Sequence, residues 1–471
     1  MDPEDRGLAL RVPTFSLLLA LIIAIAMLWF LPEDGNALRA LSGGGFVPWW
    51  VIQGIMWLWL FSLCAWGCRH RARHAGIVAL LLVIALGIIY ARPGGWYAMA
   101  VPEPSFEGMK VGYWDGQLYW DSAIAYRNGD NPFRINWYPP TFLKTFALLT
   151  HTTPTSAFAI WWLVVVASFL ASVIFSYELL LRWHVTPLAA TVLCGLLWIA
   201  NSPAVLTIGA LQASLTMLCL MLMSYVWLSR RPILSALSLA AAIGVKVSPL
   251  LIGPMLGLVR RYTWLFLLIL GCLLVACSSL PGDGLTLWRD FLFEVSGKVW
   301  QSDSIDTLAR RLMGPKLGSV MSIVVKVTIL IAAGILLWAW RNCGWSKDDS
   351  ESRDDVIQDA AFAVGCVCIV LIAPVIWAGH RVWFVPPLLF CWVHSHYRWL
   401  PLLWVSTALL LWLPMIPHLG IANVLPPGLI LLWCLRPDTM ADDHEDSALG
   451  HLMEALTTHM AGRGVGRIMS Q

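Results

Sequence analysis

Apolar segments alternate with short polar stretches along almost the whole chain. A helix that spans a membrane needs about 20 apolar residues, and fewer where it packs inside a bundle. On this rule the pattern predicts about fourteen spans. They lie near residues 13–31, 47–67, 75–91, 157–181, 185–200, 204–228, 233–246, 248–259, 262–280, 318–340, 360–378, 382–397, 399–416 and 420–435. The sequence therefore predicts an all-α polytopic membrane protein with about 12–14 transmembrane helices.

The polar stretches between these segments predict the orientation of the chain. Basic residues follow every second segment, at 69–74, Arg182 with His184, Arg230–Arg231, Arg260–Arg261, Arg341 with Lys347, and 394–398. Because Lys and Arg accumulate in cytoplasmic loops, we expect both termini in the cytoplasm and two long loops, 92–156 and 281–317, outside. The stretch 341–359 is expected to be a polar cytoplasmic loop. We expect one transmembrane domain over 1–436 and a cytoplasmic tail over 437–471.

Composition agrees with a membrane protein and excludes other classes. Of the 471 residues, 59% are hydrophobic and 13% are charged, whereas soluble domains are about half apolar and a quarter charged. A net charge of +3 argues against a nucleic-acid partner. The 28 tryptophans suit the interfacial belts of membrane proteins. None of the 11 cysteines falls in the two predicted outer loops, so we interpret them as small buried hydrophobic residues rather than disulfides.

The first outer loop combines carboxylates with many aromatic residues. From Asp115 to Tyr126 the pattern predicts a short helix at the membrane face, and Asn131-Pro132 and Pro139-Pro140 interrupt the chain after it. Aromatic rings pack on the faces of sugars, and a carboxylate accepts a hydroxyl proton. The loop therefore fits a carbohydrate site. On composition alone, an ordinary aromatic belt whose aspartates cap helices fits slightly better.

Polar residues inside or between apolar segments shift this balance toward a site. Lys246 lies in a short segment that fits either a membrane hairpin or a re-entrant loop, and an ammonium inside a span costs a few kcal/mol. Gln212 and the pair His380–Arg381 are also expected at the outer ends of their segments. Snorkelling of Lys246 is the alternative. Together these residues suit a polar cavity that binds an anionic group such as a phosphate.

The second outer loop could add further cations to the same side. Ser304 or Asp303 is expected to cap a short helix that carries Arg310 and Arg311. We therefore expect this helix to contribute positive charge on the outer face.

Several of these residues occur together in patterns of a known family. The first loop has Asp115, Tyr119, Trp120, Ala123, Ala125, Gly129, Pro132, Phe133 and Tyr138-Pro139-Pro140 in the family's order. Further matches are Gly209 to Gln212, Ala242 to Pro249 with Lys246 and Pro249, Gln301 to Leu312 with Ser304 and Arg311, and Pro374, Trp377 and His380. Over about residues 110–390, the chain resembles the polyprenol-phosphate-dependent glycosyltransferases of the GT-C superfamily. It is most similar to family eighty-seven, which includes the mannosyltransferases that extend phosphatidylinositol mannosides.

The chain also departs from the family patterns, among other places at Ile376, which replaces a serine. Gly116 stands where the family usually has an aromatic residue. The glutamine motif ending at Gln212 is shifted and lacks its asparagine, and Gly379 replaces one histidine.

The resemblance implies a GT-C-like helix bundle with loop helices and an active site on the extracytoplasmic face. Asp115 would be the general base, with Asp121 as the alternative. Lys246, His380 and either Arg311 or Arg381 would hold the leaving phosphate. The substrate-binding residues implied with them are Gln212, Tyr119, Trp120, Tyr138 and Arg127. Neither a metal nor a cofactor is expected, since the donor is itself a sugar on a polyprenyl phosphate.

The expected protein is thus an inverting hexosyltransferase of the bacterial plasma membrane. Mannose is the expected sugar, and the acceptor is a lipid or a glycan. A transporter or flippase of lipid-linked sugars is the alternative, but it predicts polar residues through both leaflets and symmetric halves, which the sequence lacks. An O-antigen ligase or polymerase is a third reading, disfavoured because the late outer loop near 417–419 is short.

Overall fold

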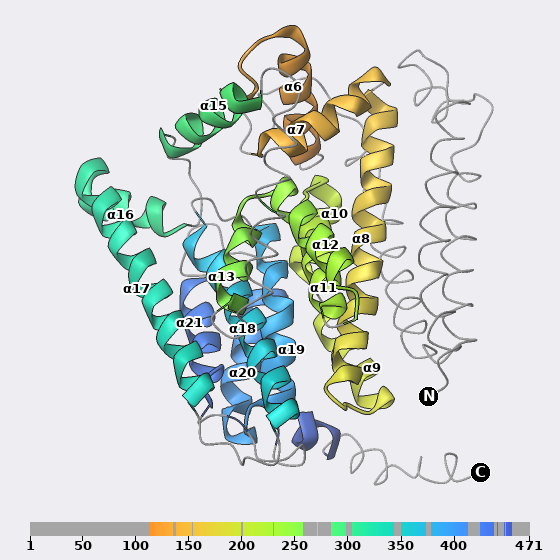
Figure 1. Cartoon of the computed structure of the whole chain (residues 1–471), viewed down its shortest axis with the longest axis vertical. Helices are drawn as coiled ribbons and strands as arrows, with labels where there is room; N and C mark the ends of the chain where they lie inside the picture. Colours follow the sequence, from red (N-terminus) through yellow and green to blue (C-terminus); the bar gives the residue numbers. More distant parts are fainter. Residues whose placement is uncertain are drawn as a thin grey trace, which may run out of the picture. The chain divides into compact units, whose positions relative to one another are not determined.

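Helices make up most of the computed structural model of the chain (Figure 1). The structure describes residues 114–134, 138–152, 154–198, 201–228, 230–257, 271, 284–297, 304–342, 350–373, 378–412, 424–437, 440, 447 and 449–454. The predicted spans near 13–31, 47–67 and 75–91 lie outside these residues, as does the span near 262–280 apart from Gly271. The described residues contain no β-strand, only two isolated bridges. The predicted all-α class is therefore confirmed.

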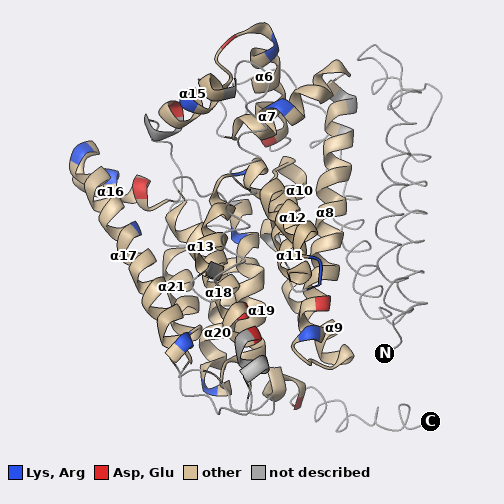
Figure 2. Ribbon diagram, in the orientation of Figure 1, with Lys and Arg blue, Asp and Glu red and all other residues tan. Residues whose placement is uncertain are grey.

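Three described helices are long and apolar enough to cross a membrane. They are Ile160–Arg182, Pro315–Asn342 and Asp355–Ile372. Shorter apolar helices are Pro187–Trp198, Ser214–Trp227, Pro232–Val245, Tyr397–Leu411 and Leu425–Cys434. Charged side chains are sparse along most of the described helices (Figure 2). The protein is thus a helical membrane protein, as the apolar pattern predicts.

The chain divides into two structural units, which we describe separately. The first unit comprises residues 1–174, 205–216 and 282–295. Its described elements are α6 (Trp114–Asn128), η1 (Pro132–Arg134), α7 (Pro140–Ala147), η2 (Leu148–His151), the greater part of α8 (Pro154–Arg182), parts of α10 (Ser202–Ala210) and α11 (Ser214–Trp227), and most of α15 (Gly284–Gly297). The second unit contains the remaining residues.

Helix α6 confirms the helix predicted from Asp115 to Tyr126. It ends at Asn128 because Gly129 takes a φ of 80°, a left-handed conformation that glycine adopts without steric cost. Helix α7 begins with Pro140 in its first turn, where the missing N–H of proline costs nothing. The sequence thus sets both boundaries of the loop between the two helices.

The continuous apolar segment 204–228 is not a single helix. The structure divides it into α10 and α11, with Leu211 between them at a φ of 57°. A positive φ is uncommon for a residue with a β-carbon. The chain is held in this turn by hydrogen bonds from the Leu211 and Gln212 N–H groups to the carbonyls of Ile208 and Thr207.

The second unit is built around α18 (Ser350–Ile372). This helix packs against α13 (Ile252–Gly257), α17 (Pro315–Asn342), α19 (Val385–His394) and α21 (Leu425–Cys434). The unit also contains the end of α8 and most of α11. Its other described elements are α9 (Pro187–Trp198), α12 (Pro232–Val245), η3 (Ser248–Leu251), α16 (Ile305–Met313), η5 (Ala378–Phe384), η6 (Tyr397–Trp399), α20 (Leu400–Thr407) and a π-helical turn (Ala408–Trp412).

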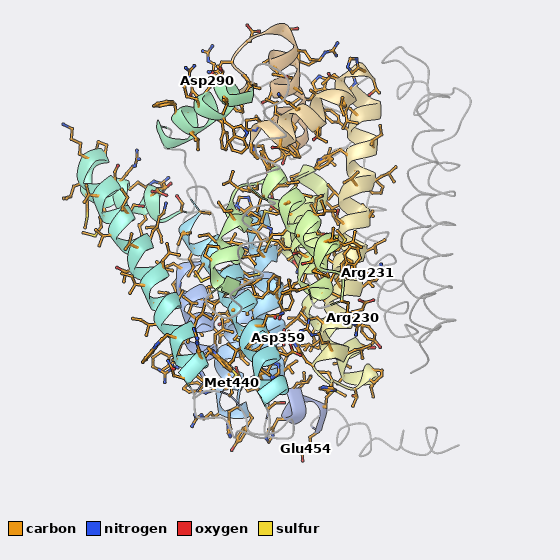
Figure 3. The ribbon with its side chains drawn as sticks, viewed as in Figure 1. Arg230, Arg231, Asp290, Asp359, Met440 and Glu454 are labelled. Atoms are coloured by element: carbon orange, nitrogen blue, oxygen red, sulfur yellow. The ribbon has the colours of Figure 1, made fainter. Side chains whose placement is uncertain are left out.

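Helix α18 corrects the prediction of a polar loop over 341–359, because residues 350–359 are helical. A buried hydrogen-bond network accounts for one of the polar residues in this helix, Asp359. The Asp359 carboxylate (labelled in Figure 3) accepts hydrogen bonds from Trp183 Nε1 at 2.6 Å and from the Tyr225 hydroxyl. A buried carboxylate needs such donors. The network therefore ties the C-terminal end of α8 and α11 to α18.

Helices α16 and α17 form a close hairpin. Ser304 is the N-cap of α16, and its Oγ accepts a hydrogen bond from the Thr307 N–H. This confirms one of the two predicted caps. At the turn, a β-carbon on Gly318 would overlap the backbone of Ala309 and Arg310. Only glycine permits so close an approach between the two helices.

Candidate functional site

In the first unit, the candidate site is built on the first turns of α6. Asp115 lies in the first turn, where the positive end of the helix dipole favours a carboxylate. Tyr119 follows one turn later on the same face of the helix and is only 1% exposed. The helix thus places a carboxylate beside a buried phenol.

Tyr119 lies at the centre of a cluster of aromatic rings. Its ring is 4.7 Å from Tyr138, 4.8 Å from Phe142, 5.5 Å from Phe146 and 6.2 Å from Trp161, all edge to face. Edge-to-face contacts at these separations are favourable. This cluster fixes the position of α6 against α7 and α8.

The hydroxyl groups of this cluster form a chain of hydrogen bonds. The Ala213 N–H donates to the Tyr119 hydroxyl over 3.2 Å, and the hydroxyls of Tyr119 and Tyr138 are hydrogen bonded to each other. Burial raises the pKa of both phenols, and the negative charge of Asp115 raises both further. Both phenols therefore remain protonated beside Asp115.

The turn between α10 and α11 packs against the same part of α6. A β-carbon on Gly116 would lie 2.8 Å from Leu211 Cδ1, so a larger residue at position 116 would displace Leu211. Trp161 Nε1 donates to the Leu211 carbonyl at 2.8 Å. Gly116 and Leu211 of the glutamine motif therefore contact each other, and both lie where the chain departs from the family patterns.

Gln212 belongs to this turn and is 5% exposed. The Ser214 hydroxyl donates to its Oε1 at 3.1 Å. With the carbonyl side of the amide occupied, the Nε2 group is the end that can donate to a substrate. The structure thus brings Asp115, Tyr119, Tyr138 and Gln212 into one neighbourhood.

Other predicted residues of the first unit have structural contacts. Arg127 donates from one guanidinium nitrogen to the Thr150 carbonyl at 2.7 Å and to the Thr150 hydroxyl at 2.9 Å. These bonds anchor the end of η2, so the contacts favour a structural role for Arg127 over the predicted substrate contact. Trp120 is half-buried and packs edge to face on Phe158 at 6.1 Å.

Asp121, the alternative base, has a different environment from Asp115. Gln117 Nε2 donates to its Oδ1 at 2.7 Å. Burial raises the pKa of Asp121, and the hydrogen bond from Gln117 lowers it. Six residues along a helix turn the side chain about 240° away from Asp115, so the two carboxylates do not face the same atom.

In the second unit, Lys246 and His380 form the core of the candidate cationic site. Lys246 is the C-cap residue of α12, and its Nζ lies 2.7 Å from His380 Nε2. The lysine lies 5.1 Å from the centre of the Trp383 ring, on which the His380 ring stacks at 4.7 Å. Because an ammonium only donates, His380 must accept through Nε2 and is therefore neutral at that contact. The pair carries one positive charge over an aromatic face.

The two arginines predicted with them differ in burial. Arg381 is 2% exposed, and its guanidinium donates to the Leu409 carbonyl at 2.8 Å, inside the π-helical turn. This bond satisfies a carbonyl where the ordinary helical ladder is interrupted. Arg311 lies exposed in the last turn of α16. The structure thus gives Arg381 a structural contact and leaves Arg311 at the surface of its unit.

Sequence reasoning missed a half-buried ion pair in the second unit. Lys326 of α17 and Ser322 both donate to the carboxylate of Asp306 on α16, Ser322 at 2.6 Å. The available signal was a lysine inside the apolar segment 318–340, the same signal that singled out Lys246.

Together the fold and these sites define a helical membrane protein that combines a carboxylate-bearing loop helix with a half-buried lysine beside a buried histidine. The sequence profile of glycosyltransferase family 87 matches residues 136–374, just over half of the chain. The chain belongs to this family, which is of the GT-C type, and is a glycosyltransferase. The matched residues include Tyr138, Gln212, Lys246 and Arg311, whereas Asp115 and His380 lie outside them. A comparison with individually curated proteins gives no match.

Proposed function

We propose that this glycosyltransferase moves mannose from a polyprenyl-phosphate donor to a hydroxyl of a lipid or glycan acceptor, with inversion. Membership of the family supports glycosyl transfer. The observation that carries the assignment of the base is the position of Asp115 in the first turn of α6, beside a buried tyrosine pair and the turn at Gln212.

Asp115 is assigned the role of general base. The acceptor oxygen bonds to the anomeric carbon while the bond from that carbon to the phosphate oxygen breaks. The polyprenyl phosphate leaves with the electron pair, and the acceptor hydroxyl proton passes to Asp115. This step needs a carboxylate within hydrogen-bond reach of the acceptor hydroxyl.

Lys246 and His380 are assigned to the phosphate of the donor. The leaving group is one phosphate, so a few fixed donors can stabilise the charge that develops on it. Lys246 supplies a positive charge, and the stacked Trp383 ring holds the pair in place. Arg311 is the arginine we assign to the same role, because Arg381 already donates to a backbone carbonyl.

The remaining assignments follow the sequence. We propose that the reaction needs neither a resident metal nor a cofactor, and that it takes place outside the cytoplasm at the bacterial plasma membrane. Both termini would lie in the cytoplasm because basic residues follow every second apolar segment.

A cysteine introduced at Ser105, in the first predicted outer loop, should react with an impermeant thiol reagent from outside. Labelling only from the cytoplasmic side would contradict the orientation.

Transfer of labelled mannose from polyprenyl-phosphate mannose in membranes tests the reaction. Asp115→Asn should lower the rate of product formation by at least about a hundredfold, which is within the usual contribution of a general base. Asp121→Asn is the matched control, because it makes the same change about one and two-thirds turns along α6 and should keep activity. Equal product from Asp115→Asn and the wild type would exclude Asp115 as the base. Loss of product only in Asp121→Asn would assign that role to Asp121.

A further inference from the structure

Leu211 has a backbone conformation that its side chain disfavours. Its φ is 57°, in the turn between α10 and α11 of the first unit. A β-carbon makes this left-handed conformation unfavourable, whereas glycine adopts it without steric cost. The Leu211 side chain is nevertheless fully buried. Because the backbone favours glycine at this position, the contacts of the leucine side chain must offset the cost.

The Leu211 side chain packs on the backbone of α6 at Gly116. A β-carbon added to Gly116 would lie 2.8 Å from Leu211 Cδ1 and 3.1 Å from Leu211 Cβ, and the first distance is too short for a real β-carbon. Gly116 is itself buried and directly follows Asp115 in the first turn of the helix. Leu211 therefore contacts the turn of α6 that carries Asp115, where a residue larger than glycine would push the two elements apart.

Hydrogen bonds from elsewhere in the first unit hold the backbone of the turn. Trp161 Nε1 of α8 donates to the Leu211 carbonyl at 2.8 Å. The Ala213 N–H donates to the hydroxyl of Tyr119, which belongs to α6, at 3.2 Å. The turn is thus joined to α6 at two points, at Leu211 and at Ala213, which lie on either side of Gln212.

We propose that Leu211 is a positioning residue, whose side chain sets the distance between the first turn of α6 and the turn that carries Gln212. The inference rests on the proposed role of Asp115 as the base. Leu211 is buried and takes no part in the chemistry; it acts through the residues beside its contact, Asp115 on α6 and Gln212 on the turn. A displacement of about 1 Å between groups that act on one substrate can cost on the order of a hundredfold in rate. A small change of packing at this contact should therefore appear in kcat.

Gly116→Ala tests the contact from the side of α6. The new β-carbon overlaps Leu211, so the helix and the turn must move apart. In the assay with polyprenyl-phosphate mannose, kcat per amount of folded enzyme should fall by about tenfold or more with little change in KM. Gly334→Ala on α17 is the matched control, because a β-carbon there meets nothing within 4 Å. It should keep the kcat of the wild type.

Leu211→Gly tests the same contact from the side of the turn. It removes both leucine atoms that crowd the new β-carbon of Gly116→Ala, and glycine suits the φ of 57°. Because residues in contact show coupled effects, Gly116→Ala should lower kcat less in the Leu211→Gly background than in the wild type. The same fold loss of kcat in both backgrounds would overturn the proposal.

Two further variants test the proposal if Gly116→Ala does not accumulate as folded protein. Leu211→Ala keeps the β-carbon and removes Cδ1, the atom nearest to the position of the added β-carbon, and should lower kcat by about tenfold. Leu211→Met restores a side chain of similar volume and should keep most of the kcat of the wild type. Equal kcat in the alanine and methionine variants would contradict the proposal.

A purely structural role for Leu211 predicts a different result. The melting temperature would then fall in Gly116→Ala and Leu211→Ala, while kcat per amount of folded enzyme stayed at the wild-type value. This result, with Asp115→Asn inactive, would overturn the proposal. Full activity in Asp115→Asn would instead contradict the proposed function, and that variant changes neither Gly116 nor Leu211.

Discussion

Lys246 and Lys326 are two lysines in apolar segments of the second unit, and their partners differ. Lys246 contacts a neutral imidazole nitrogen and lies over a tryptophan ring. Lys326 contacts the carboxylate of Asp306. A lysine in an apolar segment is costly in either case, and the Asp306 carboxylate neutralises Lys326. The proposed role of Lys246 is different, because we assign its charge to the donor phosphate.

This difference shows how the partner, rather than the lysine, decides the role. The ion pair of Lys326 lies about 16 Å along α17 from its first residue, where an unpaired charge would be poorly solvated. Asp306 and Ser322 satisfy it there. The contact closes the α16–α17 hairpin and offers no charge to a substrate. We therefore assign Lys326 to stability and Lys246 to binding.

The largest effect is expected from Lys246→Met, which removes the charge and keeps much of the side-chain volume. Transfer of mannose should fall by about a hundredfold or more, because a cation aimed at the leaving phosphate acts where charge develops. The melting temperature should change less than it does in Lys326→Met, since His380 is neutral at its contact with Lys246. Lys326→Met is the matched control. Its activity per amount of folded protein should stay close to that of the wild type. Similar activity losses in the two variants would contradict the assignment of Lys246 to binding and of Lys326 to stability.

A smaller effect, on stability, is expected when the ion pair is broken. Lys326→Met leaves the Asp306 carboxylate with the Ser322 hydroxyl as a donor but without a positive charge beside it, and the side chain of Asp306 is 23% exposed. The free energy of unfolding should fall by about 1–3 kcal/mol, as for a mostly buried charge that loses its partner. Thermal unfolding in detergent measures the loss.

The double variant Asp306→Asn with Lys326→Met sharpens this result. Removing both charges should recover part of the stability, because neither is then left unpaired. Additive losses in the double variant would mean that the two side chains are not coupled.

The comparison also shows where the sequence was informative and where it was not. The lysine in the segment 318–340 carries the same signal as Lys246, but its partner Asp306 belongs to another helix. Only the hairpin, closed at Gly318, brings the two together. In the same way, Asp359 of α18 accepts hydrogen bonds from donors on α8 and α11, which lie far from it in the sequence. Contacts between distant segments of this kind leave no local pattern.

Local signals, in contrast, predicted the elements around the candidate site well. The aromatic helix after Asp115 and the cap at Ser304 follow from adjacent residues. The turn at Leu211 was not predicted, because the apolar pattern continues through it and no proline marks it. Its position depends on Trp161 and Tyr119, which bind its backbone from elsewhere in the first unit. The residues of the site could thus be named, but not which of them contact one another.

The smallest effect is expected at the cap of the helix that carries Asp306. Ser304→Ala removes the Oγ that accepts from the Thr307 N–H in a buried position, so the free energy of unfolding should fall by about 1 kcal/mol. Ser319→Ala is the control, because its hydroxyl bonds a carbonyl on the exposed part of α17 and should matter little. If the cap acts by placing Asp306 against Lys326, Ser304→Ala should lower the free energy of unfolding less when it is added to the Asp306→Asn, Lys326→Met double variant than when it is added to the wild type. An equal loss in both backgrounds would separate the cap from the ion pair, and Ser304 would then stabilise α16 alone.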